Sequence, residues 1–128
     1  MTVSRRSLFV LIVLVLGISA AMQAWHGWRQ QQLGTELAER ARPGDIRLLV
    51  SDTCSACHHA RQWLQAHRVP FSECSIERDA ACLQTFREAF APGTPLVMVR
   101  GESQLGFDPE RVLAALQEIG ATGRSVRG

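Results

Sequence analysis

The chain has 128 residues, of which 46% are hydrophobic and 20% charged, a composition that excludes a disordered polyelectrolyte and a polytopic membrane protein. Its net charge of +2 is uneven: residues 1–44 hold five Arg against two acids, and residues 45–128 hold nine Arg against ten acids. The nearly neutral second part lacks the basic face of a nucleic-acid-binding domain. The chain contains neither Lys nor Tyr, which excludes mechanisms that use a Lys amine or a phenol.

The beginning of the chain is typical of a membrane-spanning segment. Residues 8–25 are almost entirely apolar, and as a helix they would extend about 27 Å, close to the roughly 30 Å of a bilayer core. Two basic residues precede this run and two tryptophans lie at its far end: Arg5, Arg6, Trp25 and Trp28. Because this arrangement suits a cytoplasmic flank and an interfacial aromatic belt, we expect residues 1–28 to be an uncleaved anchor.

A cleaved signal peptide is the alternative interpretation, because Ser19-Ala20-Ala21 forms an acceptable small-residue cleavage site. Both interpretations predict export of the remaining chain. In a bacterium the protein would then be a single-pass protein of the inner membrane, or a secreted one, with its domain in the oxidising periplasm.

A polar connector and one compact domain follow. Residues 29–42 are polar and helix-forming, and Pro43-Gly44 breaks any helix. We expect residues 29–44 to be a solvated helical linker, residues 45–120 to be the domain, and residues 121–128 to be a flexible tail.

Strand-like and helix-like patterns alternate from Asp45 onward. The expected strands are residues 46–50, 71–76, 96–99 and 103–105, and the expected helices are residues 54–67, residues 79–90 and a last one that begins at Pro109 after an Asp108 cap. The residues expected to face inward are Ala60, Trp63, Leu64 and His67, then Leu83, Phe86 and Phe90, then Val112, Leu113, Leu116 and Ile119. This β-α-β-α-β-β-α order predicts an α/β domain with a four-stranded mixed sheet.

The motif Cys54-Ser55-Ala56-Cys57 stands between the first strand and the first helix. Residues three apart lie on one side of a helical turn, so the two sulfurs can form a disulfide. Cys54 would lie where unpaired N–H groups and the helix dipole stabilise a thiolate. Cys57 lies one turn deeper, which suits resolution of a mixed disulfide. His58, His59 and Arg61 add donors or positive charge nearby.

These residues resemble the glutaredoxin family of the thioredoxin fold. The similarity rests on the strand with SDTCSACHHARQWL, on Gly93-Thr94-Pro95 before a strand, and on Gly106-Phe107-Asp108-Pro109-Glu110, and it spans about residues 45–120. The resemblance implies that Cys54 attacks and Cys57 resolves, and that the Thr94-Pro95 bond is cis. It also implies that Thr94, Pro95, Gly106, Phe107 and Asp108 lie beside the substrate or glutathione.

The sequence departs from the familiar family pattern between its cysteines. Ser55-Ala56 stands where familiar glutaredoxins have Pro-Tyr and thioredoxins have Gly-Pro. The Gly-Phe-Asp-Pro-Glu segment also resembles glutaredoxin-like proteins that thioredoxin reductase serves. The expected partners are therefore protein disulfides, together with glutathione as a co-substrate or a membrane electron donor, and no resident cofactor or metal is expected.

Cys74 and Cys82 form a second pair, at the second strand and in the first turn of the second helix. In an exported protein they can form a structural disulfide worth about 2.5 kcal/mol in the chain-entropy model. The alternative is two buried free thiols that pack as small apolar side chains.

Two other functions use the same motif. Cys54-Ser-Ala-Cys57-His58 is also a C-x-x-C-H sequence, the attachment signature of c-type haem, for which Met98 would be the second axial ligand. A metal site could combine Cys54, Cys57 and His58 with a remote His26 or His67. A strand directly before the motif favours thiol–disulfide oxidoreduction over both.

Overall fold

The computed structural model describes the backbone of residues 3–126 and the side chains of residues 3–118. The chain divides into two compact units, residues 1–32 and residues 33–128. Helix α1 (Arg5–Arg40) supplies the described part of the first unit and continues into the second.

The first unit is a single exposed helical segment. None of its described side chains is buried, including the apolar ones between Leu8 and Met22. Trp25 and Trp28 lie one turn apart with ring centroids separated by 5.5 Å. By length and composition this helix can cross a membrane.

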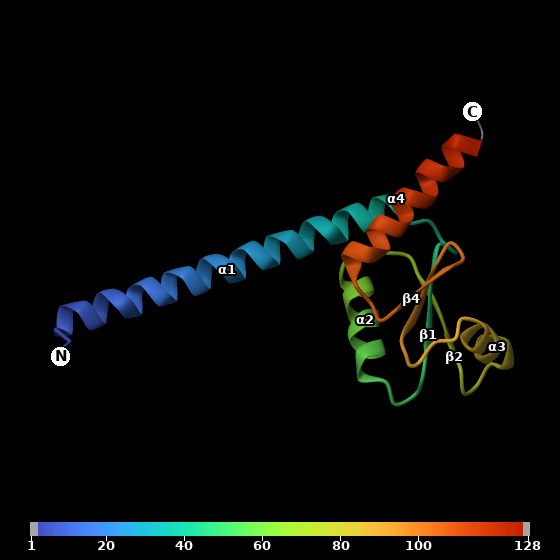
Figure 1. Ribbon diagram of the computed structural model, residues 1–128, viewed down its shortest axis with the longest axis horizontal. Coiled ribbons are helices and arrows are strands. Elements are labelled where there is room, and N and C mark those ends of the chain that lie inside the picture. The colour runs from blue at the N-terminus through green and yellow to red at the C-terminus, as the bar shows by residue number, and fades with distance from the viewer. Residues whose placement is uncertain (1–2, 127–128) are drawn as a thin grey trace. The chain divides into compact units, whose positions relative to one another are not determined.

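The second unit has the predicted order of strands and helices (Figure 1). After the end of α1 it contains β1 (Ile46–Val50), α2 (Ser55–Ala66), β2 (Ser72–Ser75), α3 (Ala80–Glu88), β3 (Leu96–Val99), β4 (Glu102–Leu105) and α4 (Pro109–Val126). The sheet order is β2-β1-β3-β4; β1 and β2 are parallel, and the other two pairings are antiparallel. The predicted four-stranded mixed sheet is confirmed.

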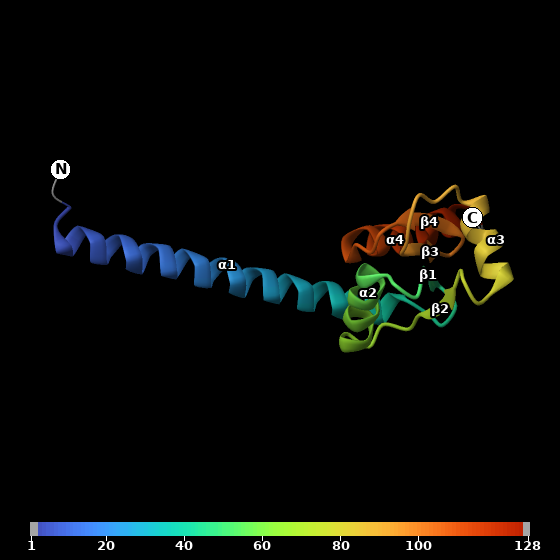
Figure 2. The ribbon, with the colours of Figure 1, turned by 90° about the horizontal axis from the view of Figure 1, so that it is seen from below.

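Alternation along the strands creates a core on each face of the sheet. In β1, Leu48 and Val50 contribute to a larger core together with residues of α2 and α4, whereas Leu49 contributes to a smaller core against α3. Figure 2 shows α2 and α4 on one side of β1 and α3 on the other. The Cys54–Cys57 motif and the second cysteine pair therefore pack against different faces of the sheet.

The end of α1 is part of the domain, so the expectation of a solvated linker is wrong from residue 33 onward. Leu37 is fully buried, Ala41 is nearly so, and Leu33 and Ala38 pack against the same larger core. Leu33, Leu37 and Ala41 are spaced four residues apart and form a stripe on one face, and that stripe packs within the domain.

Helix α3 also differs from its expected inward face. Cys82 is its buried residue, Leu83 and Phe86 are half-buried, and Phe90 is 91% exposed. The helix ends at Glu88, and Phe90 adopts a left-handed conformation with φ of 53°, while its N–H donates to the Arg87 carbonyl at 3.0 Å. This left-handed cap turns Phe90 off the helical face that periodicity assigned to it.

Helix α4 begins as predicted and ends later. The Glu110 N–H donates to Asp108 Oδ1 at 3.0 Å, which confirms Asp108 as the cap. Val112, Leu113 and Leu116 are buried, whereas the side chain of Ile119 lies outside the described residues. The segment expected as a tail is helical up to Val126.

Candidate active site

Cys54 and Cys57 are joined by a disulfide at the N-terminus of α2, with their Cα atoms 5.3 Å apart. Cys54 is the N-cap residue in extended conformation, and its Sγ accepts a hydrogen bond from the Cys57 N–H at 3.0 Å. The chain leaves β1 at Val50 and reaches this cap after three residues. The strand-to-helix junction therefore places Cys54 where the free N–H groups of the helix point.

The two sulfurs lie in different environments. Cys57 is 1% exposed and belongs to the larger core, whereas Cys54 is half-buried and packs against the edge of that core. Once the disulfide is reduced, the Cys57 N–H and the helix dipole favour a thiolate on Cys54. The geometry thus gives one accessible, stabilised thiol and one sheltered thiol.

A pocket of about 690 Å³ lies beside this disulfide. Its lining comes from three neighbouring segments: the loop between β1 and α2, the first turns of α2, and the end of β2 with the loop that follows. The lining residues are Val50, Ser51, Asp52, Thr53, Cys54, Ser55, Cys57, His58, Arg61, Glu73, Cys74, Ser75 and Arg78.

Two ion pairs span this pocket. Arg61 Nε on α2 lies 2.8 Å from Glu73 Oε2 on β2, and Arg78 Nη2 lies 2.5 Å from Asp52 Oδ1 in the active-site loop. The hydrogen bond from Arg78 holds the pKa of Asp52 below its ordinary value. Each arginine in the pocket wall is thus paired with a carboxylate.

Sequence patterns did not reveal these pairs. Asp52 and Arg78 are 26 positions apart and Arg61 and Glu73 are 12 apart, so no helical or strand periodicity connects them. The parallel pairing of β1 with β2 brings them together. The only available signal was that Asp52 and Arg61 flank the Cys54–Cys57 motif.

The other residues implied by the family resemblance form a second group. The Thr94-Pro95 bond is cis, as the resemblance implied. The Gly106 N–H donates to the Pro95 carbonyl at 2.9 Å, which joins the beginning of β3 to the turn before α4. The Phe107 ring lies 5.5 Å from that of Trp63 on α2. None of these residues lines the pocket described above, so they do not share its β2-side wall with the active disulfide.

The Asp108 carboxylate is occupied by contacts within α4. Besides capping Glu110, it lies 3.5 Å from Arg111 Nε through its second oxygen. Gly106 has a positive φ of 74°, a conformation that favours glycine at this turn.

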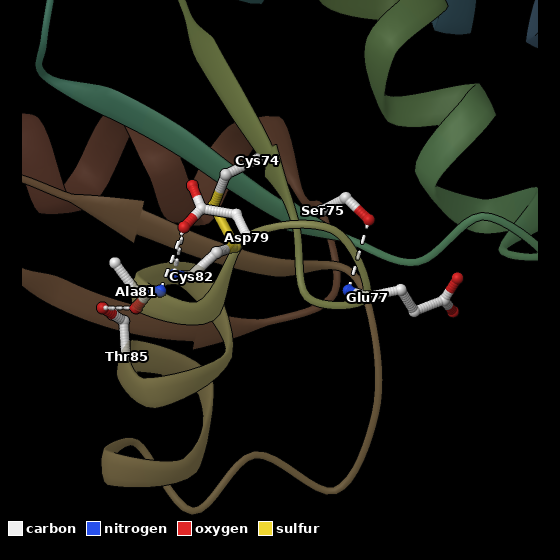
Figure 3. Close-up of a disulfide and its surroundings, with 7 residues drawn as sticks. All are labelled: Cys74, Ser75, Glu77, Asp79, Ala81, Cys82 and Thr85. Atoms are coloured by element: carbon white, nitrogen blue, oxygen red, sulfur yellow. Dashed lines mark hydrogen bonds between the residues drawn. A yellow bond between two sulfur atoms is a disulfide. The ribbon is translucent and has the colours of Figure 1, made fainter.

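A second disulfide joins Cys74 on β2 to Cys82 on α3, as expected (Figure 3). Cys82 is fully buried in the smaller core, and Cys74 packs against that core. Asp79 caps α3 by accepting hydrogen bonds from the N–H groups of Ala81 and Cys82 at 3.0 and 3.3 Å. The disulfide therefore closes a short, capped loop.

The metal site expected as an alternative is not assembled with His67. His67 follows α2 at its C-terminal end, about 18 Å along a 12-residue helix from Cys54. Its ring stacks on Trp63, with centroids 4.1 Å apart. The described residues contain no group of three or more His, Cys, Asp or Glu side chains able to hold a metal ion.

Part of the domain matches a known protein family. Residues 46–104 match the family model described as Glutaredoxin. A 31-residue stretch is 52% identical to the global transcriptional regulator Spx 1 of Lactococcus lactis subsp. lactis strain IL1403, and it covers 24% of each protein. The match therefore spans about a quarter of that curated relative.

Solved structures also align with this chain. A point mutant of the thioredoxin-like protein BC3987 aligns with a TM-score of 0.51 and 24% identity, over 58% of this chain and 96% of that one. The holo form of glutaredoxin C1 from Populus tremula x tremuloides aligns with a TM-score of 0.46 and 18% identity, over 70% and 97%.

Proposed function

We propose that the chain is a thiol–disulfide oxidoreductase of the glutaredoxin family, in which Cys54 and Cys57 exchange disulfides with exported proteins or with glutathione mixed disulfides. The observation that carries the assignment is the asymmetry of the two sulfurs. Cys54 is partly exposed, and its Sγ accepts a hydrogen bond from the Cys57 N–H, whereas Cys57 is 1% exposed.

In the reducing direction the exchange has two steps. The Cys54 thiolate attacks one sulfur of the substrate disulfide, the substrate S–S bond breaks, and the other substrate sulfur leaves as a thiolate that takes up a proton. The Cys57 thiolate then attacks Cys54 Sγ, which forms the Cys54–Cys57 disulfide and releases the second substrate thiol. Two electrons pass from the enzyme dithiol to the substrate, and a thiol donor restores the dithiol.

Glutathione and a membrane-bound dithiol are the two classes of donor that we propose. The Pro95–Gly106 hydrogen bond supports a substrate platform formed by Thr94, Pro95, Gly106, Phe107 and Asp108, as the family resemblance implies. Turnover of a disulfide peptide with glutathione, compared with turnover with dithiothreitol, separates the two classes. A glutathione-served enzyme turns over with both donors, and an enzyme served only by a dithiol fails with glutathione.

We place the domain on the periplasmic side of a bacterial inner membrane, anchored through residues 8–25. Support comes from the exposed apolar residues of α1, from the arginines that precede them, and from the paired Trp25 and Trp28 at their far end. A disulfide-forming compartment also suits two cystines in one small domain.

Trapping of mixed disulfides tests the roles of the two thiols. A full-length Cys57→Ser variant should accumulate mixed disulfides with its substrates. These adducts should be visible on non-reducing gels and should disappear after reduction with dithiothreitol. The matched Cys54→Ser variant should accumulate none, because its remaining thiol is sheltered. Equal trapping by both variants, or adducts linked through Cys74 or Cys82, would contradict the assignment.

A further inference from the structure

The second disulfide stands next to the active-site loop, although it packs on the opposite face of the sheet. Residues of β1 and β2 are paired in parallel register, with Leu49 opposite Cys74 and Val50 opposite Ser75. Parallel strands end at the same edge of a sheet, so the segments that follow Val50 and Ser75 leave it side by side. A hydrogen bond from the Ile76 N–H to the Val50 carbonyl, at 3.0 Å, extends this pairing.

The loop between Cys74 and Cys82 contains Arg78, whose guanidinium lies in the pocket beside the Cys54–Cys57 disulfide. Ser75 and Arg78 lie within this loop and line the pocket, together with Cys54 and Asp52. Arg78 donates to Asp52 Oδ1 at 2.5 Å, and Asp52 is two residues before Cys54. Figure 3 shows the disulfide, the Asp79 cap and the Ser75–Glu77 hydrogen bond that shape this loop.

We propose that the Cys74–Cys82 disulfide serves the active site by holding Arg78 against Asp52, where the guanidinium neutralises a carboxylate beside the attacking thiol. An unpaired negative charge there would disfavour the Cys54 thiolate. Arg78 is therefore a positioning residue that acts through Asp52, and the disulfide is the covalent support of its loop. The inference rests on the proposed role of Cys54 as the attacking thiol.

Other charged groups face the same pocket, and the test has to separate them. Glu77, in the same loop as Arg78, interacts with Asp52. His58 and Arg61 lie on α2, and Glu73 lies on β2 paired with Arg61. The charges of Arg61 and Glu73 cancel each other. The Arg78–Asp52 pair differs because its cation belongs to a loop that a disulfide closes, whereas Arg61 and Glu73 belong to a regular helix and strand.

The test uses a full-length Cys57→Ser protein, in which Cys54 is the single free thiol and the second disulfide stays oxidised without added reductant. Iodoacetamide labelling of the Cys54 peptide is measured by mass spectrometry from about pH 4 to about pH 9, a range in which cysteine thiolates form. The pH at which the labelling rate is half its maximum is the midpoint. In this background Arg78→Gln should raise the midpoint by roughly half a pH unit, the size expected for one unit charge near a protein surface. In about 1 M salt the difference should shrink.

Companion variants decide whether charge is the cause. Adding Asp52→Asn to Arg78→Gln should return the midpoint to that of the parent, because the unpaired carboxylate is gone. The double Cys74→Ala/Cys82→Ala variant should raise the midpoint as Arg78→Gln does, and Asp52→Asn should cancel that rise. Arg87→Gln on α3 removes an arginine that does not line the pocket, and it should leave the midpoint unchanged.

If the double cysteine variant does not fold, the Cys57→Ser parent is reduced with a phosphine before labelling. Its labelling midpoint is then compared with that of the oxidised parent. The proposal is overturned if Arg78→Gln leaves the midpoint unchanged, if Arg87→Gln shifts it equally, or if loss of the second disulfide has no effect. These outcomes are distinct from failure of the proposed function, since labelling of Cys54 requires no substrate turnover.

Discussion

Gly34 and His67 lie in direct contact within the domain. A Cβ placed on Gly34 would be 2.0 Å from His67 Cδ2 and 2.4 Å from His67 Cγ. Two contacts with Trp63 fix the His67 ring: it stacks on the Trp63 ring, and its Nδ1 donates to the Trp63 carbonyl at 2.9 Å. The end of α1 can therefore approach the end of α2 only where residue 34 has no side chain.

Gly34→Ala should destabilise the domain, although alanine is the better helix former. The added methyl group must displace the His67 ring, and overpacking of this kind costs about 1–3 kcal/mol against roughly 1 kcal/mol gained in helix propensity. Urea unfolding of the full-length protein in detergent, followed by near-UV circular dichroism, measures the difference. Gly27→Ala is the matched control, since no described residue outside its own stretch of helix lies within 4 Å of its Cβ position. Equal stability of the two variants would show that the contact is unimportant.

Asp45 ties the beginning of β1 to the turn between β3 and β4. Arg100 Nη2 donates to Asp45 Oδ2 at 3.1 Å, and the Arg42 N–H donates to the same oxygen at 2.9 Å. Burial raises the pKa of Asp45, but these hydrogen bonds and the arginine charges outweigh it and leave the pKa below its ordinary value.

The Asp45 contribution to stability should therefore depend on pH. A carboxyl group with a lowered pKa in the folded state stabilises the protein above its unfolded pKa, and this contribution is lost as the pH falls through the folded pKa. Asp45→Asn should cost about 1–2 kcal/mol at pH 7, and the difference from the parent should shrink below about pH 4. Urea unfolding at both pH values measures it, with the exposed Glu102→Gln as control. A difference that stays constant with pH would contradict this account.

Truncation to alanine should have a small effect on stability at Phe90 and a large one at Leu64, although both side chains are large and hydrophobic. Phe90 is 91% exposed, so Phe90→Ala should change the free energy of unfolding by no more than about 0.5 kcal/mol. Leu64 is fully buried in the larger core, and Leu64→Ala should cost about 2–5 kcal/mol. The same unfolding experiment compares them. A large loss of stability with Phe90→Ala would mean that the ring packs against the domain.

Topology gives a further prediction. Because Arg5 and Arg6 precede the apolar part of α1, a reporter that is active only in the periplasm should be active when fused after Gly128. Mass spectrometry of the purified protein should find the N-terminus at Met1 or Thr2. A soluble form that begins at Met22 would instead identify the segment as a cleaved signal peptide. Replacing both arginines with Glu should lower the reporter signal.

The sequence by itself determined the elements whose causes are local. Short β-rich runs bounded by turn residues predicted the strands, the Asp108-Pro109 pair predicted the start of α4, and the Cys54–Cys57 motif after a strand predicted two cysteines at a helix N-terminus. The spacing of Cys54 and Cys57 was sufficient because three residues make nearly one helical turn. Each of these features depends on neighbours within a few positions.

The tertiary structure decided what depends on residues far apart in the chain. Asp52 meets Arg78 only because β1 and β2 pair in parallel register, and the stripe that includes Leu37 is buried only because the end of α1 packs into the domain. Phe90 would face inward if α3 continued, but a left-handed cap ends the helical periodicity first. Sequence periodicity reports which face of an element is apolar, whereas the partner of that face and the place where the element stops are settled by packing.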